Sequence, residues 1–327
     1  MRLVRRLLQR LAAIAIIVAG MLSQAQAAII ISDDYGSHSF AQTPQRVVAL
    51  NWDILEQVLA LDVEPIAAPN LSGYRQWVVN PYAPETIEDI GTRAEPNLEK
   101  IARLNPDVIL AASPQQDLIP LLSQIAPVIY LPNFSENEAA AETAIRHFRT
   151  LGKLFDKQDL VEEKLTALDQ SFEQMRLRIH QHYPGPLEVL VMRFSTPNTV
   201  FLSTENSTTD YVVKHLGLNN PIHESPKAWG VQQDRINRLQ NLEDSYILYV
   251  QPFPQEDKLK DSPLWQAMPF VKKHRVNSVR AVWAYGGAMS LQYMAEAITD
   301  SLIEWAQNNE NKTIHRLLST DSVAQYF

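Results

Sequence analysis

One arginine stands in a stretch whose residue types suit recognition of an oxygen-rich ligand, Gly91-Thr92-Arg93-Ala94-Glu95-Pro96-Asn97-Leu98-Glu99. Arg93 comes just before a predicted helix that begins near Pro96, and Asn105-Pro106 ends that helix, because a residue before proline avoids the α region. A guanidinium on such a loop can bind two planar oxygen atoms at once. The alternative is a surface ion pair of Arg93 with Glu95 or Glu99.

Large aromatic residues share this loop context in both halves of the chain. They are Trp52, Trp77, Trp229, Trp283 and Tyr285. Packing in a core would explain any one tryptophan, but together with Arg93 the set predicts a cleft for a bulky, partly apolar ligand that carries oxygen acceptors. Arg193, at a predicted strand end, and Arg75, on a predicted loop spanning residues 70–84, are further cations for an anionic ligand.

Motifs for catalysis and for resident metals are missing from the sequence. It contains no G-x-S-x-G, no phosphate-binding Walker loop, no G-x-G-x-x-G and no H-E-x-x-H. Cysteine is absent and the eight histidines are scattered. We therefore expect a binding protein with no catalytic residues, no metal ligands and no cofactor of its own.

Composition narrows the class of partner. The chain has 327 residues, 46% of them hydrophobic, and a formal net charge of −8. No Lys/Arg-rich block follows the N-terminus, so nucleic acid is not an expected partner. Length and composition favour a packed globular protein, and we expect it to be a monomer.

The N-terminus has the pattern of an export signal. Arg2, Arg5, Arg6 and Arg10 precede an apolar run over residues 11–22, and Ala25-Gln26-Ala27 is a small-x-small cleavage site. This pattern predicts a signal peptide over 1–27, cleavage after Ala27, and a periplasmic protein without a permanent membrane anchor. An uncleaved anchor is the alternative, and the choice between Sec and twin-arginine export stays open.

The order of predicted elements gives the fold class. Residues 28–134 alternate strands and helices, residues 135–183 are helical, and residues 184–327 return to α/β alternation. A helix of about 23 residues, from Asp159 to about Gln181, would be about 35 Å long. We predict two α/β lobes joined by this long rigid helix, and a last helix from about Met289 to Trp305.

Several blocks resemble the periplasmic iron(III)-hydroxamate (ferrichrome-type) binding proteins of siderophore ABC importers. They are Arg46-Val47-Val48-Ala49-Leu50 with Trp52, the Gly91–Glu99 stretch, Pro263-Leu264-Trp265-Gln266-Ala267-Met268-Pro269-Phe270-Val271, and Ala281-Val282-Trp283-x-Tyr285-Gly286. The resemblance implies a helical-backbone (class III) binding protein with small lobe movements. It also implies delivery of a ferric siderophore to an inner-membrane permease driven by an ATPase.

Residue by residue, the resemblance makes Arg93 the donor to the iron-coordinating hydroxamate oxygens. It puts Trp52, Trp77, Trp229, Trp283 and Tyr285 on an aromatic wall. Ala111, Gln115 and Ile222 stand where the family prototype has a Trp, a ligand-contacting Tyr and a Trp, so we expect Gln115 at the ligand and a roomier pocket. Asp117 is a candidate permease-docking carboxylate.

Charge gives separate support for hydroxamate. A ferric trihydroxamate centre is about neutral, whereas a ferric tricatecholate is a trianion that needs several cations when buried. A catecholate or mixed siderophore, haem, a corrinoid, and an exported hydrolase are the alternatives; haem would call for an axial His, Tyr or Met.

Overall fold

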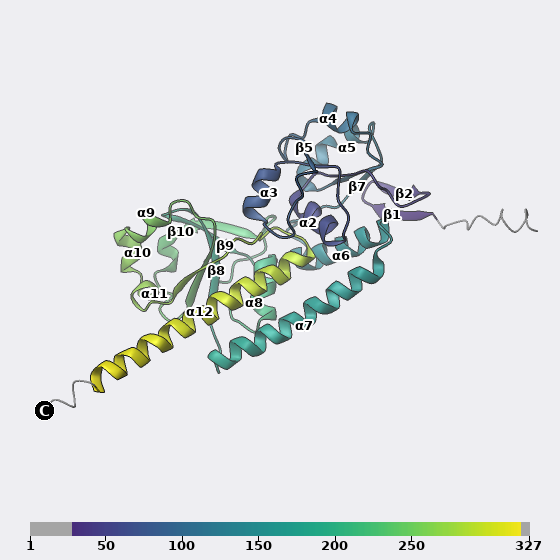
Figure 1. Ribbon diagram of the computed structural model, residues 1–327. Coiled ribbons are helices and arrows are strands. Elements are labelled where there is room, and N and C mark those ends of the chain that lie inside the picture. The colour runs from purple at the N-terminus through teal and green to yellow at the C-terminus, as the bar shows by residue number, and fades with distance from the viewer. Residues whose placement is uncertain (1–27, 322–327) are drawn as a thin grey trace, which may run out of the picture.

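The computed structural model describes residues 28–321, so the signal peptide predicted at 1–27 lies outside the described residues. Two five-stranded sheets lie apart from one another, with long helices running between and beside them (Figure 1). Each sheet is accompanied by its own short helices. This arrangement confirms the predicted α/β class with two lobes and long connecting helices.

The first sheet has the strand order β5-β4-β3-β6-β7 and is parallel throughout. Its strands are β3 (Val47–Ala49), β4 (Ala67–Ala68), β5 (Glu88–Asp89), β6 (Val108–Ala111) and β7 (Val128–Tyr130). The central strands are continuous apolar runs, as expected for strands that are covered on both faces. The segments around them are the hairpin β1 (Ile29–Asp33) and β2 (Gly36–Phe40), and the helices α2 (Trp52–Ala60), α3 (Leu71–Trp77), α4 (Leu98–Arg103), η1 (Ser113–Leu118) and α5 (Ile119–Leu122).

The second sheet has the strand order β10-β9-β8-β11-β12. Its strands are β8 (Val189–Thr196), β9 (Thr199–Ser203), β10 (Val231–Arg235), β11 (Tyr246–Val250) and β12 (Val276–Val279). Strands β8, β11 and β12 are parallel, while β9 and β10 join as antiparallel neighbours. Its helices are α8 (Thr208–His215), η2 (Ile236–Leu239), α9 (Glu256–Lys260), α10 (Pro263–Ala267) and α11 (Pro269–Lys272).

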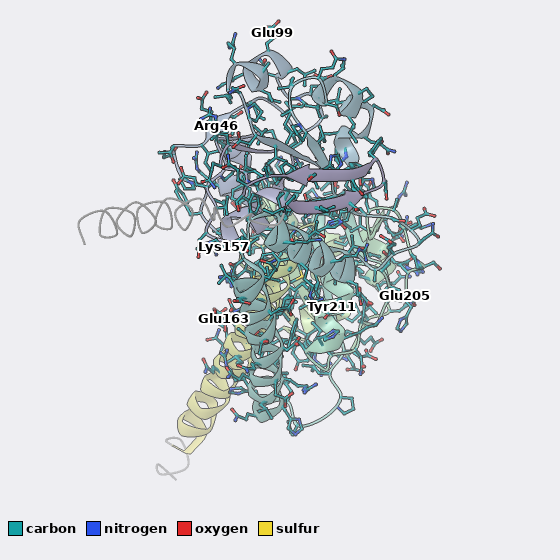
Figure 2. The ribbon with its side chains drawn as sticks, turned by 90° about the vertical axis from the view of Figure 1, so that its right-hand side faces the viewer. Arg46, Glu99, Lys157, Glu163, Glu205 and Tyr211 are labelled. Carbon is teal, nitrogen blue, oxygen red and sulfur yellow. The ribbon has the colours of Figure 1, made fainter. Side chains whose placement is uncertain are left out.

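Long helices connect the two sheets. They are α6 (Ala140–Leu154), α7 (Gln158–His182) and α12 (Ala288–Asp321). The predicted long helix is α7, whose 25 residues would extend about 37 Å. Its buried residues recur three or four positions apart, from Val161 to Ile179, while Glu163 is exposed and lies on the outer face (Figure 2). Helix α12, which follows the last strand of the second sheet, packs against α7 and also contacts α2 of the first half.

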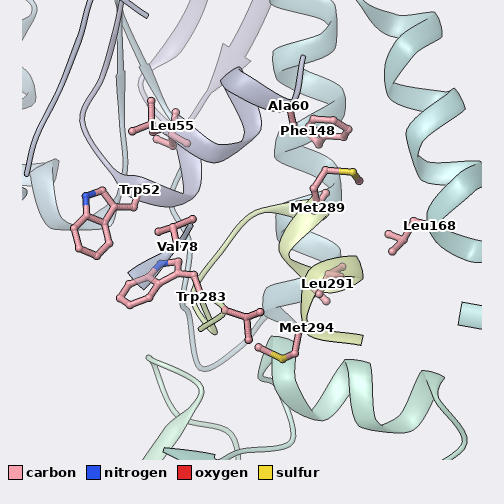
Figure 3. Close-up of a cluster of buried hydrophobic side chains, with 14 of the residues drawn as sticks. Trp52, Leu55, Ala60, Val78, Phe148, Leu168, Trp283, Met289, Leu291 and Met294 are labelled. Atoms are coloured by element: carbon pink, nitrogen blue, oxygen red, sulfur yellow. The ribbon is translucent and has the colours of Figure 1, made fainter. Parts of the chain in front are cut away.

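One hydrophobic cluster passes through both halves of the molecule. It contains Val47 and Leu110 of the first sheet, Phe148 of α6, and Val189 and Leu248 of the second sheet. Figure 3 shows part of this cluster, in which residues of α2 lie close to the start of α12. A shared core opposes large relative movement of the halves, because opening it would expose apolar surface.

Two sequence predictions need correction. The region 70–84, predicted as a loop, contains helix α3, which starts because the Asn70 side chain accepts a 3.2 Å hydrogen bond from the Gly73 N–H. The last helix does not end at Trp305 but continues to Asp321. Residues 306–321 contain neither proline nor glycine, so no helix-breaking residue follows Trp305.

Within residues 28–321, no helix combines the length and the apolar composition that a crossing of a bilayer requires.

Candidate ligand-binding site

A cavity of about 650 Å³ is lined by side chains from both halves of the chain. This volume lies in the range of small-molecule sites. The lining residues are Asn51, Trp52, Asn70, Trp77, Thr92, Arg93, Ala94, Pro114, Phe134, Arg193, Trp229, Trp283 and Tyr285. Seven of the eight predicted ligand-binding residues are therefore brought together here, and Gln115 is the exception.

Arg93 lies on the aromatic floor of this cavity. Its guanidinium carbon is 4.1 Å from the ring centroid of Trp52 and 5.6 Å from that of Trp283. Desolvation lowers the pKa of Arg93, and the charge of the buried Asp53 opposes that shift. Among the residues with described side chains, neither Glu95 nor Glu99 forms an ion pair with Arg93. The surface ion pair considered for Arg93 is therefore wrong.

The loop that carries Arg93 is fixed by hydrogen bonds at its ends. Gly91 has a φ of +99°, which a side chain would rarely adopt, and its N–H donates to Asp89 Oδ1 at 2.9 Å. The Glu95 N–H donates to Thr92 Oγ1 at 2.9 Å, and Asn97 caps α4 by accepting from the Lys100 N–H. The sequence analysis used Pro96 to place a helix after Arg93, but it could not give the cap or the direction of the Arg93 side chain.

Gln115 supports this loop from behind. Its Nε2 donates to the Arg93 backbone carbonyl at 2.6 Å, and its Oε1 accepts from the Ala112 N–H at 3.0 Å. The side chain is fully buried and does not line the cavity. The expectation that Gln115 contacts ligand is therefore corrected: both of its polar groups already have backbone partners.

Ala111 and Ile222 also lie behind the cavity wall. Ala111 is fully buried in the core on the far side of the first sheet, and Ile222 is packed in the core of the second. Neither residue lines the cavity. The expectation of a roomier pocket therefore stays a prediction.

The aromatic wall is a chain of ring contacts across the two halves. The Trp52 and Trp283 centroids are 5.1 Å apart at an edge-on angle (Figure 3). The Tyr285 ring centroid is 5.2 Å from that of Trp283. Phe134 stacks on Trp229 at 5.3 Å and meets Tyr285 edge-on at 5.7 Å. Such contacts fix ring orientation before a ligand arrives.

Both environments considered for the tryptophans, the hydrophobic core and the ligand surface, occur in the structure. Trp52 is 3% exposed and belongs to the shared core, where its Nε1 donates to the Pro69 carbonyl. Trp229 is 51% exposed, which is unusual for so large a ring. Trp77, predicted on a loop, is the last residue of α3, and Trp52 is the first residue of α2.

A buried carboxyl group holds the segment that carries Trp283 and Tyr285. Glu56 Oε2 accepts from the Gly287 N–H at 3.1 Å and from Ser290 Oγ at 2.6 Å. These donors lie at the N-terminus of α12, where a carboxylate is stabilised by the helix dipole. Burial raises the pKa of Glu56 to about 7, against the effect of both hydrogen bonds.

Arg193 enters the cavity from strand β8. Its guanidinium carbon is 5.1 Å from the Phe201 ring, 5.7 Å from Trp77 and 5.8 Å from Tyr285. Trp77 belongs to the first half of the chain and Arg193 to the second, so this contact joins the halves. Arg75 instead donates to the carbonyls of Ala83 and Pro84 and pairs with Glu85, and it does not line the cavity.

Sequence reasoning missed Phe134 and several small lining residues. Phe134 follows β7 in the segment that leads to α6, and its φ of +68° is rare for an aromatic residue. No periodicity or motif marks it in the sequence. Asn51 and Asn70 could have been found as helix caps next to predicted strands, although capping alone does not indicate a ligand.

The described residues contain no cluster of three or more His, Cys, Asp or Glu side chains that could hold a metal ion.

Comparison with known proteins identifies one family and several relatives that are similar over most of the chain. Residues 47–282 match the family described as periplasmic binding protein. The FhuD siderophore-binding protein of Vibrio cholerae, solved with Fe³⁺-Desferal, is 55% identical, with a TM-score of 0.79 over 80% of this chain and 98% of that one. The iron(3+)-hydroxamate-binding protein FhuD of Escherichia coli is 28% identical over 268 residues, which cover 81% of this chain and 90% of the relative.

A third relative has a different named ligand. The Fe(3+) dicitrate-binding periplasmic protein FecB of Escherichia coli is 31% identical over 286 residues, 84% of this chain and 90% of that protein. The family match spans most of the described residues and includes both sheets. The chain belongs to the periplasmic binding protein family.

Proposed function

We propose that this protein is the substrate-binding component of an ABC importer and that it binds ferric hydroxamate siderophores in the periplasm. The observation that carries the proposal is the Arg93 guanidinium, held 4.1 Å above the Trp52 ring inside a cavity lined by both halves. A guanidinium there can donate to the iron-coordinating oxygens, while the aromatic wall accepts the apolar parts of the ligand.

The ligand residues we propose are Arg93, Trp52, Trp77, Trp229, Trp283, Tyr285 and Arg193, with Phe134 added from the structure. Support comes from the 55% identical relative, whose crystal structure holds Fe³⁺-Desferal. The iron enters as cargo inside the siderophore, so the protein supplies no metal ligand and carries out no reaction.

Haem is a weaker candidate because the described lining offers poor axial ligands. It contains no histidine and no methionine, and its single tyrosine is Tyr285. Burial raises the pKa of Tyr285, which opposes formation of a phenolate that could bind iron. A ferric carboxylate ligand is the stronger second candidate, because a 31% identical relative is a ferric dicitrate-binding protein.

We further propose residues 28–134 and 184–327 as the two lobes, with 135–183 as the helical spine. The mature protein would begin at Ala28 after signal-peptide cleavage, act as a monomer and deliver its cargo to an inner-membrane permease. Asp117, exposed on η1, is our candidate docking carboxylate in the first lobe.

Tryptophan fluorescence of residues 28–327 tests the binding function. We expect saturable quenching by a ferric trihydroxamate, weaker quenching by a ferric tricatecholate, and none by the iron-free ligands. Several tryptophans line the cavity, so occupation should alter their emission. If the ferric trihydroxamate causes no saturable quenching, the proposed binding function is wrong.

A further inference from the structure

The two guanidinium groups of the cavity have different neighbours. Arg93 has a negative neighbour, because the charge of the buried Asp53 acts on it. Asp53 is itself held by Asn51 Nδ2 at 2.6 Å and Asn133 Nδ2 at 3.3 Å. Arg193 has no ion pair and no hydrogen-bond acceptor among the residues whose side chains the structure describes. Neither guanidinium lies within ion-pair distance of a carboxylate among the described side chains, and the contacts that the structure gives for Arg193 are with aromatic rings.

The rings around Arg193 orient it without neutralising it. The ring centroids of Phe201, Trp77 and Tyr285 each lie within 6 Å of the guanidinium carbon, a distance at which a cation is attracted to an aromatic face. An aromatic face accepts no conventional hydrogen bond, so the five N–H donors of Arg193 stay available to a ligand. The rings also limit the directions in which the side chain can point.

The lining as a whole is positive in an acidic protein. It contains Arg93 and Arg193 and no aspartate or glutamate, whereas the whole chain carries a formal net charge of −8. A ferric trihydroxamate centre is about neutral and can be recognised by Arg93. Arg193 then faces the ligand without a matching anionic group, and low-dielectric walls strengthen its field inside the cavity.

We propose that Arg193 is a specificity-determining residue and that this site prefers ferric hydroxamate siderophores bearing a carboxylate on the arm that faces strand β8. This inference rests on the proposed function and names the ligand charge that the site selects. A carboxylate is planar and accepts two parallel N–H bonds, which matches the guanidinium fork.

The same geometry disfavours a ferric tricatecholate. That complex carries three negative charges, and the two arginines of the lining would leave one of them without a cationic partner. A ligand with a neutral iron centre and a single carboxylate needs two guanidinium groups, one for the iron-coordinating oxygens and one for the carboxylate. The charge count therefore favours a mixed hydroxamate–carboxylate ligand.

A matched ligand series tests the proposal on residues 28–327. The probe is one linear ferric trihydroxamate whose terminal amine is free, acetylated or succinylated, so that its end group is a cation, a neutral amide or a carboxylate. Dissociation constants are measured by tryptophan quenching and calorimetry at low and at high salt. The variants are Arg193→Gln and, as the control with the same change in net charge, Arg235→Gln, which is exposed on β10 and outside the cavity.

We expect the wild-type protein to bind the succinylated ligand at least tenfold more tightly than the amine form. The ratio should fall below threefold in Arg193→Gln, stay unchanged in Arg235→Gln, and shrink at high salt. A wild-type ratio near one, a ratio that survives Arg193→Gln, or tighter binding of a ferric tricatecholate than of the succinylated ligand would overturn the inference. If the acetylated ligand also fails to bind, the proposed function itself fails.

Discussion

The side-chain amide of Gln115 donates a 2.6 Å hydrogen bond to the backbone carbonyl of Arg93. Gln115 is fully buried, while the Arg93 guanidinium reaches the cavity, so the two residues act on opposite sides of the same loop. The second bond of Gln115, from the Ala112 N–H, ties that loop to the end of strand β6. The loop of the cavity arginine is thus held by an amide that does not itself line the cavity.

Replacing Gln115 by leucine should lower both stability and affinity. The Arg93 carbonyl and the Ala112 N–H would each lose a partner, and an unsatisfied buried group costs about 1–3 kcal/mol. Chemical denaturation and ligand titration measure the two effects. Gln116→Leu, at the exposed neighbouring position, is the control and should leave both close to wild type. Wild-type affinity in Gln115→Leu would show that the loop does not need this support.

Removing the Arg93 guanidinium should weaken binding of a ferric trihydroxamate by at least about 1.5 kcal/mol, or more than tenfold, because a charge-assisted hydrogen bond is lost. Arg93→Lys should recover only part of the affinity, since an ammonium group cannot form the paired planar contact. Titration calorimetry measures both variants. Arg103→Ala, exposed at the end of α4, is the control. Unchanged affinity in Arg93→Ala would take Arg93 out of the site.

Glu56 should make the protein less stable as the pH rises. Burial raises the pKa of Glu56 to about 7 from 4.5, so between these values the folded state holds a proton that the unfolded state releases. The contribution to the free energy of unfolding is fully present below pH 4.5 and falls by up to about 3 kcal/mol as the pH rises through 7. Denaturation of the wild type and of Glu56→Gln from pH 4.5 to 8 measures it. With rising pH, the free energy of unfolding of the wild type should fall relative to that of Glu56→Gln. A difference that does not change with pH would contradict the raised pKa of Glu56.

His147 should have the opposite pH dependence. It is buried on α6, and desolvation lowers its pKa to about 4 from 6.5. The unfolded state takes up a proton below pH 6.5 while the folded state does not, so up to about 3 kcal/mol of stability is lost as the pH falls towards 4. His147→Gln should lose less stability than the wild type over this range. The same substitution at the exposed His180 should follow the wild-type profile, and a wild-type profile in His147→Gln would show that the buried imidazole is not responsible.

Local sequence determined the elements and the chemical type of the site. The alternation of strand and helix patterns over residues 28–134 and 184–327 predicted the α/β class, and the helical pattern from Asp159 to about Gln181 predicted the long helix α7. Pro96 placed Arg93 on a loop ahead of a helix, and in the structure that helix begins two residues later, at Leu98. These are short-range signals, because hydrophobic periodicity and capping act within a few residues.

Only the tertiary structure decided which of the candidate residues meet. Gln115 and Arg93 are 22 positions apart, and Trp52 and Trp283 are 231 apart, so no local pattern could report that the first pair bonds behind the loop and the second pair meets at the cavity. Phe134, with its positive φ, gave no sequence signal at all. Sequence names the side chains that can do the chemistry, but packing of distant elements sets the direction of each side chain and places Arg193 of the second half against Trp77 of the first.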